Sequence, residues 1–392
     1  MKKTAILFIL LLVSVAVKPQ TNSIEQVLKS VEANNRELKA SQQLTVSRKL
    51  EAKSENNLSD PSVSYSYQFG SPSSIGKSTE LNVLQEFDFP TLYSRRSELN
   101  RLKGNTFDRQ DGSMRRQILL SAKEVCLDLI LLNKKKVILD EWIKLGNELS
   151  ALYKRRLELG DANALEAGKI NMEILNIKTG CMLNEAQRQT KLEELRSLNG
   201  NIAIEFNDTT YLSVEDIIDF ALLKQEALAG DTELLLLEGE QKLARQQLAV
   251  NKSQWLPKLE LGYRLNTGLG EKFNGVIVGF SVPLFENKSK VKQAKVQSVY
   301  VDMKKESAVL QAESRLLRLY KEAQLIKTSM KEFDQAVAVN TMLLLNEALR
   351  KQQISTIDYC VDANTVFQNQ LNYMELENRY QKVMAQLYQH RL

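Results

Sequence analysis

The sequence predicts a mainly α-helical protein with a small β part, arranged as two similar halves. Three features lead to this prediction: long stretches with helical apolar spacing, two pairs of short segments in which apolar and polar residues alternate, and motifs that occur once in each half. The chain has 392 residues but only 16 glycines and 6 prolines, so tight turns and extended linkers are few. Each half is expected to contain a helix, a β-hairpin and a long helical hairpin.

The duplication is clearest where the first strand of each hairpin begins. The segment Pro61–Tyr67 resembles Pro257–Tyr263, and other motif pairs keep a similar separation. This separation of roughly 190 residues is far longer than the period of a solenoid repeat. The pattern predicts a first repeat at 21–200, a linker at 201–212 and a second repeat at 213–392.

The N-terminus has the pattern of a secretory signal peptide, expected at residues 1–20. A positive start at Lys2 and Lys3 precedes a short apolar run, which ends in the small residues Ser14 to Ala16. The run is too short to cross a bilayer, and no later segment approaches the roughly 18 consecutive apolar residues of a transmembrane helix. The sequence therefore predicts export from the cytoplasm without membrane-spanning helices.

The first half begins with an expected helix from Ser23, a good N-cap, to about Asn57. The apolar period then changes to two, because valine, tyrosine and phenylalanine alternate with serine and glutamine after Pro61. This alternation predicts a strand at about 61–70, and a second strand is expected at about 80–90. Each is close to the ~9–11 residues that cross a membrane as a tilted barrel strand.

A long helix is predicted from Thr91 to a break at Gly160 and Asp161, because this stretch has no proline and few glycines. At 1.5 Å per residue it would be roughly 100 Å long. A half-length helix is expected next, at about 164–198. Two half-length helices stacked end to end could flank one long helix and form a uniform cylinder of paired helices.

The second half repeats this order of elements. A helix is expected at about 213–253, strands at about 257–266 and 275–284, and a long helix at about 288–351. A final helix should run to Leu392.

Four amphipathic strands are too few to close a barrel within one chain. Lipid cannot satisfy an open strand edge, so closure requires oligomerisation, and three chains would supply twelve strands around a water-filled lumen. The polar strand faces, with Ser64, Ser66, Glu260 and Arg264, are expected to line that lumen, whereas the apolar faces meet lipid. Trp255 suits the membrane interface. Soluble sheets with one wet face show the same alternation, but the signal peptide, the duplication and the long helices favour the membrane.

The composition argues against an enzyme, a metal site and nucleic-acid binding. The net charge of +5 is weak for this length, and a mean hydropathy of −0.30 indicates that most of the mature chain contacts water. His390 is the only histidine, and Cys126, Cys181 and Cys360 stand singly without metal-binding spacing. Neither a nucleophile–base arrangement nor a phosphate loop is present, so no cofactor is expected.

In their order and duplication, these features resemble the TolC-like outer-membrane efflux channel family over about Ser23 to Leu392. The segments that carry the resemblance are the opening Ile24 to Leu38, the strand starts Asp60-Pro61 and Leu256-Pro257, the return strand Gly279 to Phe285, and the helical hairpin tips Arg156 to Glu166 and Leu349 to Ala363.

The resemblance implies a homotrimer, with a 12-stranded barrel in the outer membrane of a Gram-negative bacterium continuous with a large periplasmic α-helical barrel. It implies a passive exit duct of a tripartite export system, supplied by a periplasmic adaptor (membrane fusion) protein and an inner-membrane pump such as a proton-driven transporter. Drugs, metal ions and secreted proteins are all compatible cargoes. The alternatives are a periplasmic coiled-coil adaptor or scaffold without a channel, and a soluble secreted helical bundle. Adaptors usually carry several compact β-domains, whereas this chain has only two strand pairs.

The resemblance also suggests that the periplasmic adaptor docks at the two hairpin tips. Gly160, Asp161, Gln352 and Gln353 are the candidates. The second tip departs from the family pattern, since Gln352 stands where the first tip has a glycine.

An acidic periplasmic gate is suggested just after the second tip. Asp362 precedes Ala363 as in the family motif, and Asp358 lies four residues earlier, on the same helix face. Three copies around a narrow axis would form a ring that selects cations and binds divalent ions, and mutual repulsion would raise the pKa of its carboxyl groups. The alternative is that both are ordinary solvated residues.

Overall fold

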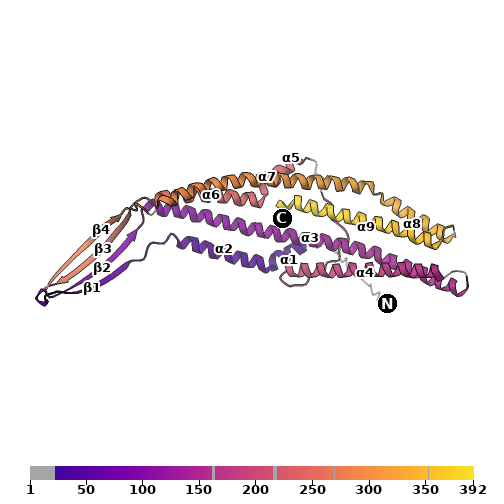
Figure 1. Ribbon diagram of the computed structural model, residues 1–392, viewed down its shortest axis with the longest axis horizontal. Helices are drawn as coiled ribbons and strands as arrows, with labels where there is room; N and C mark the ends of the chain where they lie inside the picture. Colours follow the sequence, from indigo (N-terminus) through magenta and orange to yellow (C-terminus); the bar gives the residue numbers. More distant parts are fainter. Residues whose placement is uncertain (1–22, 161–163, 215–218, 269, 286, 352) are drawn as a thin grey trace, which may run out of the picture. The chain divides into compact units, whose positions relative to one another are not determined.

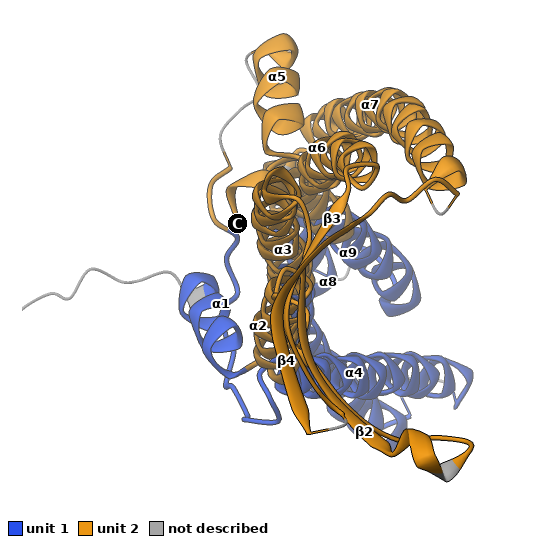
Figure 2. Cartoon of the chain, turned by 90° about the vertical axis from the view of Figure 1, so that its left-hand side faces the viewer, with its two compact units in different colours: residues 1–34, 122–211, 342–374 blue, residues 35–121, 212–341, 375–392 orange. Residues whose placement is uncertain are grey.

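The computed structural model describes residues 23–160, 164–214, 219–268, 270–285, 287–351 and 353–392 (Figure 1). The predicted signal peptide at 1–20 lies outside the described residues, as do Asp161 and Gln352. The protein is mostly helical with one four-stranded antiparallel sheet. It divides into two compact units, coloured separately in Figure 2: unit 1 comprises residues 1–34, 122–211 and 342–374, and unit 2 comprises residues 35–121, 212–341 and 375–392.

The sheet belongs to unit 2, where its four strands lie side by side in chain order (Figure 1). The strands are β1 (Ser62–Phe69), β2 (Lys77–Phe87), β3 (Lys258–Gly268) and β4 (Glu271–Ser281), with a short 3-10 turn, η1 (Ser73–Ile75), between β1 and β2. Pairing of β2 with β3 joins the two distant hairpins, with Val83 opposite Tyr263. Within the described residues, β1 and β4 each keep one edge without a partner strand.

Unit 2 also contains helices, four of which adjoin the strands along the chain. The helical segments are α2 (Arg36–Ser54), the part of α3 (Pro90–Glu158) up to residue 121, α5 (Phe220–Gly230), α6 (Thr232–Ser253), α7 (Lys288–Glu332), the start of α8 (Gln335–Arg350) up to residue 341, the end of α9 (Thr356–Leu387) from residue 375, and the C-terminal turn η2 (Gln389–Arg391). α6 runs alongside α7 (Figure 1). Leu223 of α5, Leu316 of α7 and the C-terminal Leu387 are buried in one apolar core.

Unit 1 contains two helical hairpins around a shared core. Its helices are α1 (Ser23–Asn34), α3 from residue 122, α4 (Ala164–Leu198), the end of α8 (Gln335–Arg350) and α9 (Thr356–Leu387) up to residue 374. Trp142 of α3 stacks on Phe367 of α9 with ring centroids 4.4 Å apart, and Ile174 of α4 packs in the same cluster. Large side chains from three helices thus hold the two hairpins together.

The structure confirms the helices predicted at 91–159 and 164–198 but corrects three others. Each corrected helix is interrupted by an Asn or Asp whose side chain accepts a backbone N–H of the helix that follows: Asn35 accepts from Leu38, Asp231 from Glu233, and Asp334 from Ala336, all at 2.9 Å. Such side chains compete with helical hydrogen bonds and favour caps. The corrected predictions are those at 23–57, 213–253 and 288–351, and the second of these has no helix before Phe220 among its described residues.

Candidate functional site

The sheet has one mainly polar and one mainly apolar face because its register aligns alternate residues of the four strands. Ser64 lies opposite Asn82, which lies opposite Arg264. Residues two or four positions along a strand share a face, so Ser66 and Glu260 lie on this same side. The register therefore brings the four residues predicted to line a lumen onto one face.

The polar face also contains an ion pair that sequence reasoning missed. Arg264 lies 2.9 Å from the Glu80 carboxylate, which also accepts a hydrogen bond of 2.7 Å from the Asn82 amide. Glu80 and Asn82 alternate with the apolar Leu81 and Val83 in the sequence, so the two-residue period was the available signal. Their pairing with β3 depends on long-range register, which one strand alone does not specify.

Apolar side chains cover the opposite face of the sheet and are exposed. Val276, in the middle of β4, is 78% exposed. The other members of this exposed set are Val63, Tyr65, Tyr67, Phe69, Val83, Leu259, Leu261, Tyr263, Val278 and Phe280. A contiguous exposed apolar surface of this kind marks an interaction with a protein or a membrane.

The first hairpin tip in unit 1 turns at a glycine. α3 ends at Glu158, and Gly160 follows with φ of +80°, a left-handed conformation that favours glycine. Its N–H donates to the carbonyl of Leu157 at 3.1 Å. The sequence prediction of a helix break here is confirmed, and Asp161 lies outside the described residues.

The second hairpin tip is closed by a different backbone contact. α8 ends at Arg350, and the N–H of Gln353 donates to the carbonyl of Ala348 at 2.9 Å. Gln353 is exposed, whereas Ile354 packs against the core of unit 1. Both tips lie at the same end of unit 1 (Figure 1).

Asp358 and Asp362 are both exposed on α9, but their surroundings differ. The hydroxyl of Ser355 donates to the Asp358 carboxylate at 2.7 Å and accepts from the Asp358 N–H at 3.1 Å, which caps the start of the helix. For Asp362, no hydrogen bond or ion pair is found among the described residues. The neighbouring Ala363 is buried, so the helix directs Asp362 away from the core.

Buried hydrogen bonds fix the start of α9. The hydroxyl of Tyr359, which is almost fully buried, donates to the Asn346 side chain of α8 at 2.7 Å. The hydroxyl of Tyr153 on α3 is hydrogen-bonded to Thr356. These contacts set the rotation of α9 and hence the direction in which Asp362 points.

Several solved structures of membrane proteins have a similar fold. The Campylobacter jejuni CmeC outer membrane channel matches with a TM-score of 0.76 and 13% identity, over 94% of this chain and 85% of that chain. The Vibrio cholerae outer membrane protein VceC matches with a TM-score of 0.75 and 14% identity, over 94% and 96%. A structure of CusC matches with a TM-score of 0.78 and 14% identity, over 94% and 92%.

The chain has a TolC-like fold. No family model and no curated protein matches its sequence, so this conclusion rests on the three-dimensional similarity. Among the residues that the structure describes in the TolC-like fold, no helix has both the length and the apolar character needed to cross a membrane. Nor do three or more metal-ligating His, Cys, Asp or Glu side chains gather at one place within these residues.

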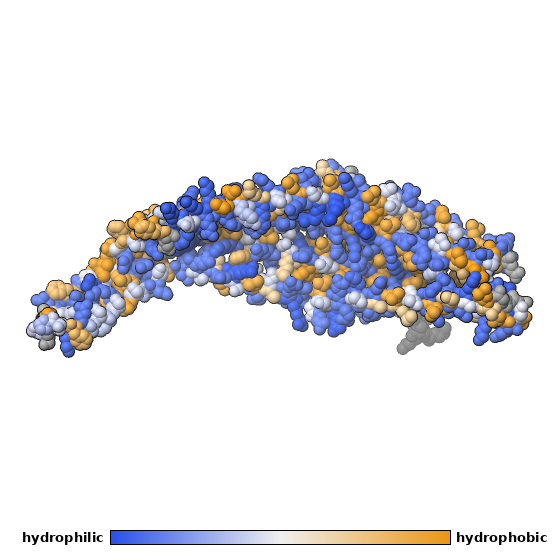
Figure 3. Space-filling model, in the orientation of Figure 1, coloured by the Kyte–Doolittle hydropathy of each residue, from blue (hydrophilic) through white to orange (hydrophobic). Residues whose placement is uncertain are grey.

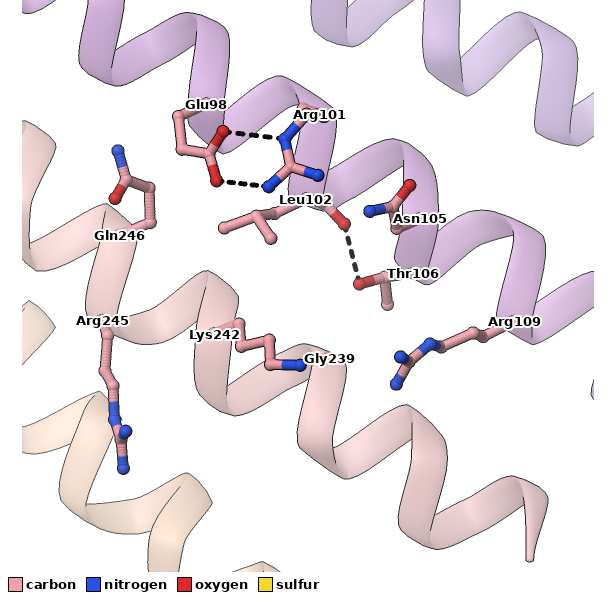
Figure 4. Close-up of a pocket in the computed structure, with 10 residues that line it drawn as sticks. All are labelled: Glu98, Arg101, Leu102, Asn105, Thr106, Arg109, Gly239, Lys242, Arg245 and Gln246. Atoms are coloured by element: carbon pink, nitrogen blue, oxygen red, sulfur yellow. Dashed lines mark hydrogen bonds and ion pairs between the residues drawn. The ribbon is translucent and has the colours of Figure 1, made fainter. Parts of the chain in front are cut away.

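Other polar features of this TolC-like chain are explained by helix packing. A groove of about 470 Å³ lies between α3 and α6 and is lined by several cationic side chains. Figure 4 labels the residues that line it. Arg101 forms two hydrogen bonds with Glu98, at 2.8 and 2.6 Å, and Lys242 lies 2.6 Å from the Glu238 carboxylate. Because these cations already have carboxylate partners, the groove gives no sign of an anion site.

The cysteines of unit 1 are not activated thiols. Burial raises the pKa of the Cys126 thiol to about 12 and that of Cys360 to about 11. Burial also raises the pKa of Cys181. All three are protonated at neutral pH, which disfavours nucleophilic or redox chemistry.

Proposed function

We propose that this chain forms a passive exit duct in the outer membrane of a Gram-negative bacterium. The observation that carries the proposal is a sheet with one polar face, one exposed apolar face and two open edges, within a TolC-like fold. An apolar face suits lipid and a polar face suits a water-filled lumen. The neighbouring structure CmeC is described as an outer membrane channel, which supports the same role here.

The open edges favour a ring of three chains. An unpaired edge in lipid costs several kcal/mol for each unsatisfied backbone group, so a membrane sheet must close. β1 of one copy and β4 of the next can pair head to tail, and a head-to-tail interface closes into a ring. Three copies give a 12-stranded barrel with room for a lumen lined by Ser64, Ser66, Glu260 and Arg264. Each copy would contribute two equivalent repeats, at 21–200 and 213–392.

The hairpin tips are proposed as the periplasmic end of the duct. Three copies of Asp362 would form the acidic gate, with Asp358 as a further acidic residue on the same face. A periplasmic adaptor would dock at Gly160, Asp161, Gln352 and Gln353. The sequence has no nucleotide-binding loop of the GxxxxGK[ST] type, so an inner-membrane pump would supply the energy.

Single-channel conductance of the detergent-purified mature protein in planar bilayers tests the proposal. We expect a cation-selective conductance that divalent cations block from the periplasmic side. A protein that stays soluble without detergent and never conducts would overturn the duct. That outcome would favour a periplasmic helical scaffold instead.

A further inference from the structure

The polarity of the surface changes abruptly at the end of the sheet where β3 begins and β4 ends. Lys258 pairs with Ser281, so the segment before β3 and the segment after β4 leave the sheet at the same end. After β4, Leu284 is 62% exposed and Phe285 is 90% exposed. Figure 3 shows an apolar patch where the sheet meets the helices, next to a hydrophilic surface.

Two buried asparagines fasten these segments to each other. The Asn287 side chain donates to the carbonyl of Gln254 at 2.6 Å, and Asn251 donates to the carbonyl of Lys290 at 3.0 Å. Trp255 and Leu256 follow directly in the chain and are themselves partly exposed. Because breaking a buried hydrogen bond is costly, these two bonds hold the two connections next to each other. The exposed apolar side chains of both connections therefore form one surface.

Lysines follow the apolar residues within three positions. Lys288, Lys292 and Lys295 are exposed and recur at positions i, i+4 and i+7, which places them on one face of α7. Lys252 is exposed on the neighbouring connection, at the end of α6. None of these four lysines has an ion-pair partner among the described residues. Like charges on one helix face repel each other, so the arrangement favours an anionic partner.

We propose that this junction, Trp255, Leu256, Leu284 and Phe285 with the lysine face of α7, anchors the protein to anionic phospholipids of the periplasmic leaflet. The inference rests on the proposed function, since it requires the sheet to span the membrane. Aromatic side chains favour the level of the headgroups, and lysines beside a membrane reach the lipid phosphates with their long side chains. The boundary of the hydrocarbon region then falls between Phe285 and Lys288.

Quenching of Trp255 by brominated lipids tests the anchor, because the chain has only two tryptophans. A Trp142→Phe background leaves Trp255 as the single reporter. The protein is reconstituted in vesicles of phosphatidylglycerol and phosphatidylcholine. In one set of vesicles the phosphatidylglycerol is brominated, and in the other set the phosphatidylcholine is brominated. At equal mole fraction, we expect the brominated anionic lipid to quench more strongly. Each lysine replaced by glutamine on the α7 face should lower the relative binding constant about fivefold, and salt should weaken the preference.

A second set of lysines on the same helix provides the matched control. Lys321→Gln, Lys327→Gln and Lys331→Gln change the charge of α7 equally but lie far along the helix, so the lipid preference should persist. Equal quenching by both lipids in vesicles that conduct would overturn the anchor while leaving the duct intact. Absence of quenching by any brominated lipid, together with absence of conductance, would overturn the duct and the anchor with it.

Discussion

At the scale of single residues, Asp358 and Asp362 have the same charge and exposure but different contacts. Asp358 is hydrogen-bonded to Ser355, the residue that caps α9, whereas Asp362 has no hydrogen bond or ion pair with the described residues. An acidic side chain without a local partner is free to act on ions or on copies of itself. The sequence could identify both acids, but only the structure separates a residue bonded to the helix cap from a gate candidate.

Replacing Asp362 by alanine should therefore relieve the block of conductance by divalent cations, because the ring loses its carboxylates. Asp358→Ala is the comparison variant, since it removes the same charge one helical turn away, from a carboxylate that is already hydrogen-bonded to Ser355. We expect Asp358→Ala to relieve the block less than Asp362→Ala. It should destabilise the start of α9 by only about 0.3–1 kcal/mol, because the first turn loses a favourable negative charge while Ser355 still accepts the backbone N–H of residue 358. Conductance measured against the concentration of divalent cations for both variants checks the prediction. Equal relief of the block in the two variants would contradict it.

A second prediction concerns the C-terminus of unit 2, where Arg391 donates two hydrogen bonds to Glu226, at 2.8 and 2.9 Å, and His390 contacts the same carboxylate at 3.0 Å. The hydrogen bonds from Arg391 and then His390 lower the pKa of Glu226 from 4.5 to about 2. Since the folded state holds this proton less tightly, the stabilisation is present above pH 4.5 and is lost as the pH falls toward 2.

Glu226→Gln should therefore speed hydrogen exchange of the C-terminal amides at neutral pH, and the difference from the unaltered protein should vanish near pH 2. Glu233→Gln, at an exposed position of α6 without an ion-pair partner among the described residues, should leave exchange unchanged. If the ratio of the exchange rate in Glu226→Gln to that in the unaltered protein does not vary with pH, the contact of Glu226 does not stabilise the C-terminus.

At the scale of secondary-structure elements, the strands were predictable because their period of two is local information. The long helices at 90–158 and 164–198 were predictable for the same reason. The helix breaks at Asn35, Asp231 and Asp334 were missed because capping depends on the geometry of a single side chain. The pairing of β2 with β3 joins segments far apart in sequence, so the Glu80–Arg264 contact required the register.

The two faces of the sheet predict opposite effects of the same substitution. Val276→Arg places a charge at the middle of the exposed apolar face, which should reduce the stability of the membrane-inserted protein by about 2–4 kcal/mol. Ser66→Arg introduces the same side chain on the polar face, directly opposite Glu80, and should have little effect. Denaturant titration of protein folded into vesicles measures both. Similar losses for the two variants would argue against a lipid-facing side.

At the scale of the whole molecule, the sheet edges link the fold to its assembly. Ser62 begins β1 and Ser281 ends β4, so both lie at the same end of the sheet and on opposite edges. Three strand spacings of about 4.8 Å separate the two edges within one chain. That separation is well beyond the roughly 7 Å that limits a disulfide between two cysteine Cα atoms.

A protein carrying both Ser62→Cys and Ser281→Cys should therefore form disulfides only between neighbouring chains. If three copies close head to tail, oxidation in detergent or in vesicles should yield dimers and trimers on a non-reducing gel, with no larger species. Each single variant retains the three native cysteines and serves as the control, which should stay monomeric on the same gel. A ladder extending beyond three chains would indicate an open or larger assembly, whereas monomers throughout would leave the edges unpaired and contradict the barrel. Because the edges can be satisfied in lipid only by another copy, the outcome decides between a closed duct and a single-chain periplasmic scaffold.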